Sequence, residues 1–175
     1  MNVKNNKRKR DSVERIEKAF LQELQQKNIS QIKVSDICTS ANINRSTFYA
    51  NYEDIYDLAE KIRQKLEEEV NQHFIKDINT EISVNDFLKL FHHIKDNQVL
   101  YSFFFKLGYE NQCNLKMHEM LELSHENTSD IDYHIEFFRN GFNAIVKKWL
   151  KSGCEKSPEE MRDILFKEYK GRLNI

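Results

Sequence analysis

The sequence contains little proline and little glycine, the two residues that most often interrupt helices. Its 175 residues include one Pro and four Gly, whereas a sheet protein with many turns needs more of both. The length is sufficient for one or two domains with a buried core. We therefore expect an all-α fold built from long helices.

Cysteine is also scarce, and long apolar runs are missing. Cys38, Cys113 and Cys154 have unrelated spacings, which argues against a disulfide framework and indicates a reducing compartment. No apolar run approaches a membrane span of about 20 residues. The basic N-terminus is not followed by the apolar segment of a secretory signal. These absences predict a cytoplasmic protein with no membrane partner.

The signatures of the common enzyme classes are missing as well. The four glycines are scattered, so no phosphate-binding loop is present. No Cys-x-x-Cys or His-Glu-x-x-His spacing occurs. His92 and His93 are poor joint ligands, because neighbouring residues on a helix point about 100° apart, and His118 with Cys113 is an isolated pair. We expect no catalytic site, no metal and no cofactor.

Charge is unevenly distributed along the chain. The first 52 residues hold ten Lys and Arg against five acids, a balance of +5, and the net charge of −1 leaves −6 for the remainder. A basic end on an acidic body suits a protein that binds a polyanion at one end. Residues 7–10 form a short basic arm, which is either a solvated tail or a phosphate contact.

Residues 34–52, VSDICTSANINRSTFYANY, predict two short helices joined by a tight turn. In the first, Val34, Ile37, Cys38 and Ala41 share one face at helical spacing. Asn42 opens the turn, since asparagine is the residue besides glycine that most readily adopts the left-handed conformation. This arrangement is a helix-turn-helix.

The second of these helices, expected at about residues 44–51, presents a polar surface. Phe48 is its buried side chain, and no acid lies between Thr39 and Tyr52. Two short helices occur in many proteins, but this composition suits contact with double-stranded DNA. Arg45 is the candidate for reading a guanine, and Ser46 and Tyr49 for base or methyl contacts. The candidates for phosphate contacts are Ser35, Thr47, Asn51 and Tyr52. The candidate DNA-binding residues are Ser35, Asn44, Arg45, Ser46, Thr47, Tyr49, Asn51 and Tyr52.

Two longer helices are expected on either side of this motif. One begins at Asp11, with Glu14 completing a capping box, and ends near Lys27. The other begins at Glu53 and runs for about 24 residues, or about 36 Å. This second helix joins an N-terminal DNA-binding region, residues 1–52, to a C-terminal region, residues 53–175.

The residues from about Arg10 to Leu58, with the core VSDIC and ANINRSTFYANYEDIYDL, resemble the tetracycline-repressor (TetR) family of bacterial transcription regulators. Three positions depart from the pattern of the family. Asn42 replaces a turn glycine, Lys33 replaces a threonine cap, and Ile55 replaces a lysine that contacts phosphate. The resemblance implies a three-helix head, a long helix that couples ligand binding to that head, and dimers formed by a C-terminal helix pair.

The C-terminal pair of helices is expected at residues 131–149 and 158–169. Ser157-Pro158-Glu159-Glu160 predicts the start of the second, with a cap, a proline and then acids. The apolar seams of the two helices either form a homodimer interface or complete the core of one chain. The candidate interface residues are Ile131, Ile135, Phe138, Phe142, Ile145, Trp149, Met161, Ile164 and Leu165.

Aromatic residues are concentrated in the C-terminal region, which holds ten of the twelve Phe. Further helices are expected there at residues 84–95, 97–107 and 113–124. The rings either line a cavity for a small hydrophobic or aromatic effector or simply fill the core. The candidate pocket residues are Phe91, Tyr101, Phe104, Phe105 and Phe138.

The sequence thus predicts a dimeric transcriptional regulator, expected to be a repressor that a small effector releases from a palindromic operator. A rival hypothesis is a TetR-like protein–protein adaptor or co-activator that does not itself read DNA. Ile55, the missing turn glycine and the modest charge of the N-terminal region leave room for that rival.

Overall fold

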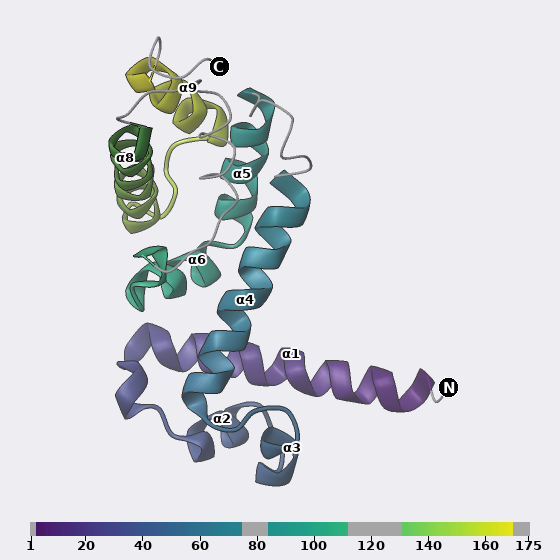
Figure 1. Ribbon diagram of the computed structural model, residues 1–175. Coiled ribbons are helices and arrows are strands. Elements are labelled where there is room, and N and C mark those ends of the chain that lie inside the picture. The colour runs from purple at the N-terminus through teal and green to yellow at the C-terminus, as the bar shows by residue number, and fades with distance from the viewer. Residues whose placement is uncertain (1–2, 75–83, 112–130, 170–175) are drawn as a thin grey trace. The chain divides into compact units, whose positions relative to one another are not determined.

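The computed structural model describes residues 3–74, 84–111 and 131–169. Every regular element within these ranges is helical (Figure 1), which confirms the all-α prediction. The predicted helix at 113–124 lies outside the described residues. The elements are α1 (Val3–Gln26), the 3-10 turn η1 (Ile29–Gln31), α2 (Val34–Ser40), α3 (Arg45–Tyr49), α4 (Ile55–Phe74), α5 (Val84–Asp96), α6 (Gln98–Lys106), η2 (Tyr109–Asn111), α8 (Ile131–Lys151) and α9 (Pro158–Tyr169).

The chain divides into an N-terminal unit, Met1–Lys65, and a C-terminal unit, Leu66–Ile175. This division falls inside α4 and not after residue 52 as expected from the sequence. Polar contacts explain the difference, because the first half of α4 is tied to the other helices of the N-terminal unit. Lys65 Nζ lies 2.9 Å from a Glu17 carboxylate oxygen on α1, and Lys61 Nζ donates to the Asn51 carbonyl at 3.0 Å.

Helix α1 begins at Val3, well before the start predicted at Asp11. The Ser12 hydroxyl donates to the Arg8 carbonyl at 2.9 Å, a bond between residues four apart within a continuous helix. Asp11 is therefore an interior helical residue, and the predicted capping box with Glu14 does not form. The basic arm, residues 7–10, is part of this helix and is not an unstructured tail.

The turn between α2 and α3 has the conformation predicted for Asn42, whose φ is 51°. The Ile43 N–H donates to the Cys38 carbonyl at 3.0 Å and the Asn42 N–H to Thr39 at 3.2 Å. These two bonds satisfy carbonyl groups that the end of α2 would otherwise leave unpaired. Arg15 on α1 donates to the carbonyls of Ala41 and Asn42 at 3.2 and 3.3 Å. The turn is thereby fixed against α1.

The C-terminal unit is filled by aromatic rings from α5 and α8. Phe91 lies 5.9 Å from Phe142 and 5.6 Å from Trp149, measured between ring centroids. Phe87 lies 6.0 Å from Phe138 and 6.1 Å from Phe166 on α9. Such edge-to-face and tilted contacts add to the free energy gained from apolar burial.

Helix α9 begins at Pro158, as predicted from the sequence. The Ser157 hydroxyl accepts a hydrogen bond from the Glu160 N–H at 3.2 Å, and the Glu160 carboxylate accepts one from the Ser157 N–H at 2.8 Å. This reciprocal pair is a capping box. Before it, Trp149 Nε1 donates to the Lys156 carbonyl at 3.0 Å, which holds the connecting turn against α8.

Candidate functional site

The polar side of α3 is the candidate surface for nucleic acid. Phe48 is fully buried beneath the helix, whereas Arg45 and Ser46 are exposed and Tyr49 is 57% exposed. Asn44, also exposed, precedes the helix in an extended conformation. The helix thus presents one cation, one hydroxyl and one phenol from adjacent turns, and these groups can hydrogen-bond to base edges and phosphates.

Three further candidates, Ser35, Thr47 and Asn51, are half-buried. The Ser35 hydroxyl, in the first turn of α2, donates to an Asp36 carboxylate oxygen at 3.4 Å. Asn51 Nδ2 donates to the Thr47 carbonyl at 2.8 Å and so caps the C-terminal end of α3. Thr47 and Asn51 therefore help to hold the short helix in shape as well as bordering its exposed side.

Tyr52 differs from the other candidates because only 4% of its surface is exposed. Burial, followed by the negative charge of the nearby Glu17 carboxylate, raises the pKa of its phenol. Its ring packs 5.6 Å from the ring of Phe48. The structure thus places Tyr52 beneath α3, with little of its surface available for the phosphate contact predicted for it.

Lys61 is a cation that was not predicted from the sequence to belong to this region. Its ammonium lies 5.3 Å from the Tyr52 ring centroid and 2.8 Å from an Asp57 carboxylate oxygen. It also donates to the carbonyl of Asn51, just after α3. Ile55, by contrast, is 6% exposed and belongs to the core. The four-residue spacing of Asp57 and Lys61 was a signal that could have indicated this pair.

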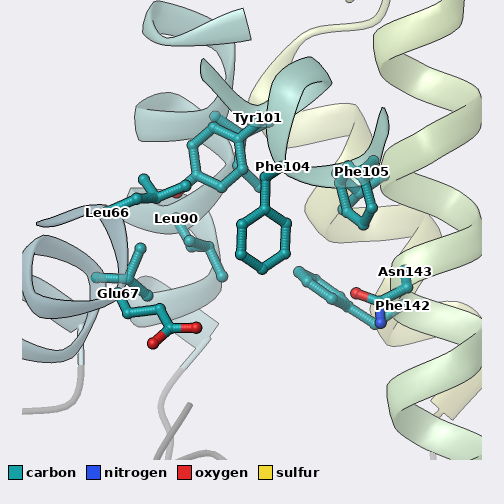
Figure 2. A pocket seen from close by; sticks show the side chains of 11 residues that line it. Leu66, Glu67, Leu90, Tyr101, Phe104, Phe105, Phe142 and Asn143 are labelled. Carbon is teal, nitrogen blue, oxygen red and sulfur yellow. The ribbon is translucent and has the colours of Figure 1, made fainter. Parts of the chain in front are cut away.

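A second candidate site is a cavity inside the C-terminal unit (Figure 2), with a volume of about 40 Å³. Of the predicted pocket residues, Tyr101, Phe104 and Phe105 line it. Phe91 and Phe138 are buried elsewhere in the core, because they pack against other rings of α5 and α8. The complete lining is Leu66, Glu67, Val70, Leu90, Ile94, Tyr101, Phe104, Phe105, Phe142, Asn143 and Val146.

Polar groups border this apolar cavity. Figure 2 shows Glu67 and Asn143 on opposite sides of Phe104. The Tyr101 hydroxyl lies 2.8 Å from Nδ1 of His93. Glu67, Asn143 and the aliphatic lining were not predicted from the sequence, since aromatic clustering was the only signal for pocket residues. A cavity of this kind can hold a small apolar group with one or two hydrogen-bonding atoms.

The predicted dimer seam is mostly internal to a single chain. Phe138, Phe142, Trp149, Met161 and Leu165 are each less than 8% exposed. Ile145 and Ile164 are half-buried, and the side chains of Ile131 and Ile135 lie outside the described residues. The buried members pack within one chain, where Phe138, Phe142 and Trp149 contact rings of α5. The exposed side of α8 carries other aromatics, Tyr133 at 78% and Phe137 at 62% exposure.

Metal-binding clusters and membrane-spanning helices can be assessed for the residues that the structure describes. No group of three or more His, Cys, Asp or Glu within them is placed to hold a metal ion. Among the helices in these ranges, none is both long and apolar enough to cross a membrane.

Comparison with known proteins supports a family and a fold. A family model for the C-terminal region of TetR-type transcriptional regulators matches residues 83–170, half of the chain. Among solved structures, the chain is similar to the "Dihydroxyacetone kinase operon activator DhaS", with a TM-score of 0.64 and 21% sequence identity over 93% of this chain and 96% of that one. At this identity the likeness concerns the fold. No curated protein sequence matches the chain.

Proposed function

The chain belongs to the TetR family of transcriptional regulators, and we propose that it acts as a dimeric, sequence-specific DNA-binding regulator in a bacterial cytoplasm. The observation that carries the proposal is the surface of α3, where Arg45, Ser46 and Tyr49 are exposed over a fully buried Phe48. No acid is present on this helix or in the turn before it. Such a surface complements the negatively charged major groove.

Each half of a pseudo-palindromic operator would receive one copy of α3. Arg45 reads a guanine, because a guanidinium can donate two hydrogen bonds to its major-groove edge. Ser46 and Tyr49 contact bases or a thymine methyl group. Asn44, Ser35, Thr47 and Asn51 fix the register through contacts with phosphates. Tyr52 supports α3 from beneath.

Dimerisation would use the outer side of α8 and not the buried seam. Tyr133 and Phe137 lie four residues apart and therefore share one side of the helix. Large exposed aromatics are enriched in the contact surfaces of subunits. Ile145 and Ile164 remain candidates for the edge of this interface, since both are half-buried. Sedimentation of Tyr133→Lys and Phe137→Lys variants should give monomers, whereas Ser102→Lys, which adds the same charge at an exposed position on α6, is the control.

The effector would be a small hydrophobic or aromatic molecule that enters the cavity lined by Tyr101, Phe104 and Phe105. The cavity volume of about 40 Å³ is well below the roughly 300–1,000 Å³ of pockets that enclose drug-sized ligands. A ligand must therefore enlarge it by moving the surrounding rings. An effector regulates DNA binding only if it binds one state of the protein more tightly than the other. The proposed effector favours the state that is released from DNA, which gives repression.

The rival hypothesis, an adaptor that does not read DNA, is weakened at one point. Asn42 has the positive φ that the turn requires, so the missing glycine does not disable the motif. The buried Ile55 still removes one phosphate contact. The similar structure is an operon activator by name, and the direction of regulation therefore requires its own measurement, with a reporter gene placed behind the selected operator.

The first test is to select bound duplexes from a random DNA pool with the purified full chain. The proposal expects a palindromic sequence, with an affinity that falls steeply as salt increases because bound counterions are released. If a folded dimer enriches no sequence, the DNA-binding proposal is wrong and the adaptor hypothesis takes its place.

A further inference from the structure

Four consecutive cations lie near the N-terminal end of α1. Lys7, Arg8, Lys9 and Arg10 are all exposed, and no acid precedes Asp11 in the sequence. Successive residues of a helix point about 100° apart. These four residues, here called the basic turn, therefore present a positive charge on every side of the helix.

The basic turn is unfavourable for the helix that contains it. Helix α1 begins at Val3 and has no acid in its first turn, so no carboxylate there offsets the four cations that follow. Lys7 and Arg10 are three residues apart, a spacing at which like charges repel. Among the described residues, none of these four side chains forms an ion pair. A bound polyanion would relieve this repulsion.

The position of the basic turn relative to α3 is fixed by the anchored part of α1. Arg15 bonds to the carbonyls of Ala41 and Asn42, in the turn that leads into α3. Ile16 and Phe20, which follow it, are fully buried. The basic turn precedes Arg15 by five to eight residues, or about 8–12 Å along the helix axis. Figure 1 shows this end of α1 continuing past α2 and α3, which belong to the same unit.

We propose that the basic turn binds the phosphates of duplex DNA that flank the half-site read by α3. This inference rests on the proposed function, because the same DNA molecule must occupy α3. Duplex DNA carries one charge per about 1.7 Å of its axis, so phosphates are available over the whole length of the turn. The contact depends on charge and not on base sequence.

The test compares two duplexes that contain the selected operator, one ending at the half-sites and the other extended by about ten base pairs on each side, roughly one helical turn. The variant is K7Q/R8Q/K9Q/R10Q, since glutamine has a helix propensity close to that of lysine and arginine. The matched control, K106Q/K148Q/K151Q/K167Q, removes four exposed lysines from the C-terminal unit. Both variants therefore change the net charge by the same amount.

The K7Q/R8Q/K9Q/R10Q variant should bind the extended duplex more weakly than the unaltered chain does. On the extended duplex, removal of the basic turn should reduce the slope of log K against log salt by about 0.9 for each phosphate that the protein no longer neutralises. Affinity at low salt should fall by at least about tenfold if each subunit normally neutralises two or more phosphates through the basic turn. The short duplex and the control variant should behave as the unaltered chain does.

Equal salt slopes for the unaltered chain and the variant on the extended duplex would overturn the inference while leaving α3 as the DNA-binding element. Equal decreases in affinity on both duplexes would show general attraction and would overturn the flanking contact. If the unaltered chain binds no duplex, the proposed function fails as well. Thermal unfolding provides a second readout, since removing the repulsion should leave the melting temperature unchanged or raise it. A lower melting temperature would assign the cations a structural role and contradict the proposal.

Discussion

The two units of this chain are stabilised in different ways. In the N-terminal unit, individual polar contacts hold the helices and the turn in place, as Arg15 on α1 does at the turn before α3 and Lys65 on α4 does with Glu17 on α1. In the C-terminal unit, overlapping rings such as Phe91, Phe142 and Trp149 fill the space between helices. Polar contacts define geometry at particular atoms, whereas ring packing depends on volume and tolerates rearrangement.

This difference matches the tasks proposed for the two units. A surface that reads DNA must hold a few side chains at fixed distances, which single hydrogen bonds can do. A cavity that opens for a ligand must instead allow its walls to move. Tyr101, Phe104 and Phe105 can change rotamer without breaking a backbone hydrogen bond. We therefore expect the N-terminal unit to hold its DNA-contacting side chains in fixed positions and the C-terminal unit to rearrange around a ligand.

The largest expected effect is on the ring packing. Phe91→Ala removes a fully buried ring that contacts Phe142 and Trp149, and should lower the free energy of unfolding of the C-terminal unit by about 3–5 kcal/mol. Trp149 is the only tryptophan, so its fluorescence during denaturant unfolding reports on this unit alone. Val99→Ala on α6, at a position that is 44% exposed, is the control and should shift the midpoint little. Equal shifts would contradict the assignment of Phe91 to the core.

The contrast between local polar contacts and ring packing between distant helices also explains how far the sequence could predict the fold. Short-range chemistry was sufficient for the helix-turn-helix, because Asn42 can be identified by its tolerance of a positive φ and Phe48 by its spacing. It was also sufficient for the start of α9, where Ser157 and Glu160 form a local capping box. The early start of α1 was missed, because Asp11 matches a helix cap whether or not the helix continues before it.

The apolar seam of α8 marks the limit of such reasoning. A heptad-like spacing shows that Phe138, Phe142 and Trp149 share one side of the helix, but it does not show what covers that side. Here α5 supplies the cover within one chain. The same limit applies to the cavity, since its aliphatic lining comes from helices that the pattern alone cannot bring together. Tyr52 was similarly ambiguous until its burial was known.

The second prediction concerns the proposed DNA surface. Arg45→Ala should cost about 1–3 kcal/mol of binding free energy at one operator position in each half-site, and so relax specificity there. Thr47→Ala should instead weaken binding to all sequences alike, because a phosphate contact carries no base information. Affinities for single-base operator variants measure both effects. Uniform decreases for both substitutions would contradict the division of roles between the two residues.

A smaller effect is expected at the turn. Asn42 has a φ of 51°, and alanine in the left-handed region is less favourable than asparagine by about 1 kcal/mol. Asn42→Ala should therefore weaken DNA binding while leaving the unfolding midpoint reported by Trp149 unchanged. Asn42→Gly is the control, since glycine adopts this conformation without strain. A shift in the Trp149 midpoint would mean that the two units unfold together, and the contrast between them would not hold for stability.

The smallest expected effect is the contribution of the Tyr52 hydroxyl to stability, which can be recognised by its dependence on pH. Tyr52→Phe removes a buried hydroxyl near the Glu17 carboxylate and should cost about 1 kcal/mol at pH 7. Burial raises the pKa of Tyr52 above its ordinary value of 10.0, so that in the unfolded chain the phenol ionises first. The contribution of the hydroxyl to stability is therefore fully present below about pH 10 and is lost as the pH rises toward the folded-state pKa.

The measurement is the urea unfolding midpoint of the unaltered chain and of Tyr52→Phe, followed by circular dichroism from pH 7 to 11. The two midpoints should converge and then cross. Lysine titration affects both proteins alike and cancels in the difference. If the difference between the two midpoints stays constant to pH 11, the phenol ionises equally in the folded and unfolded chains. The packing around Tyr52 would then be looser than its burial indicates.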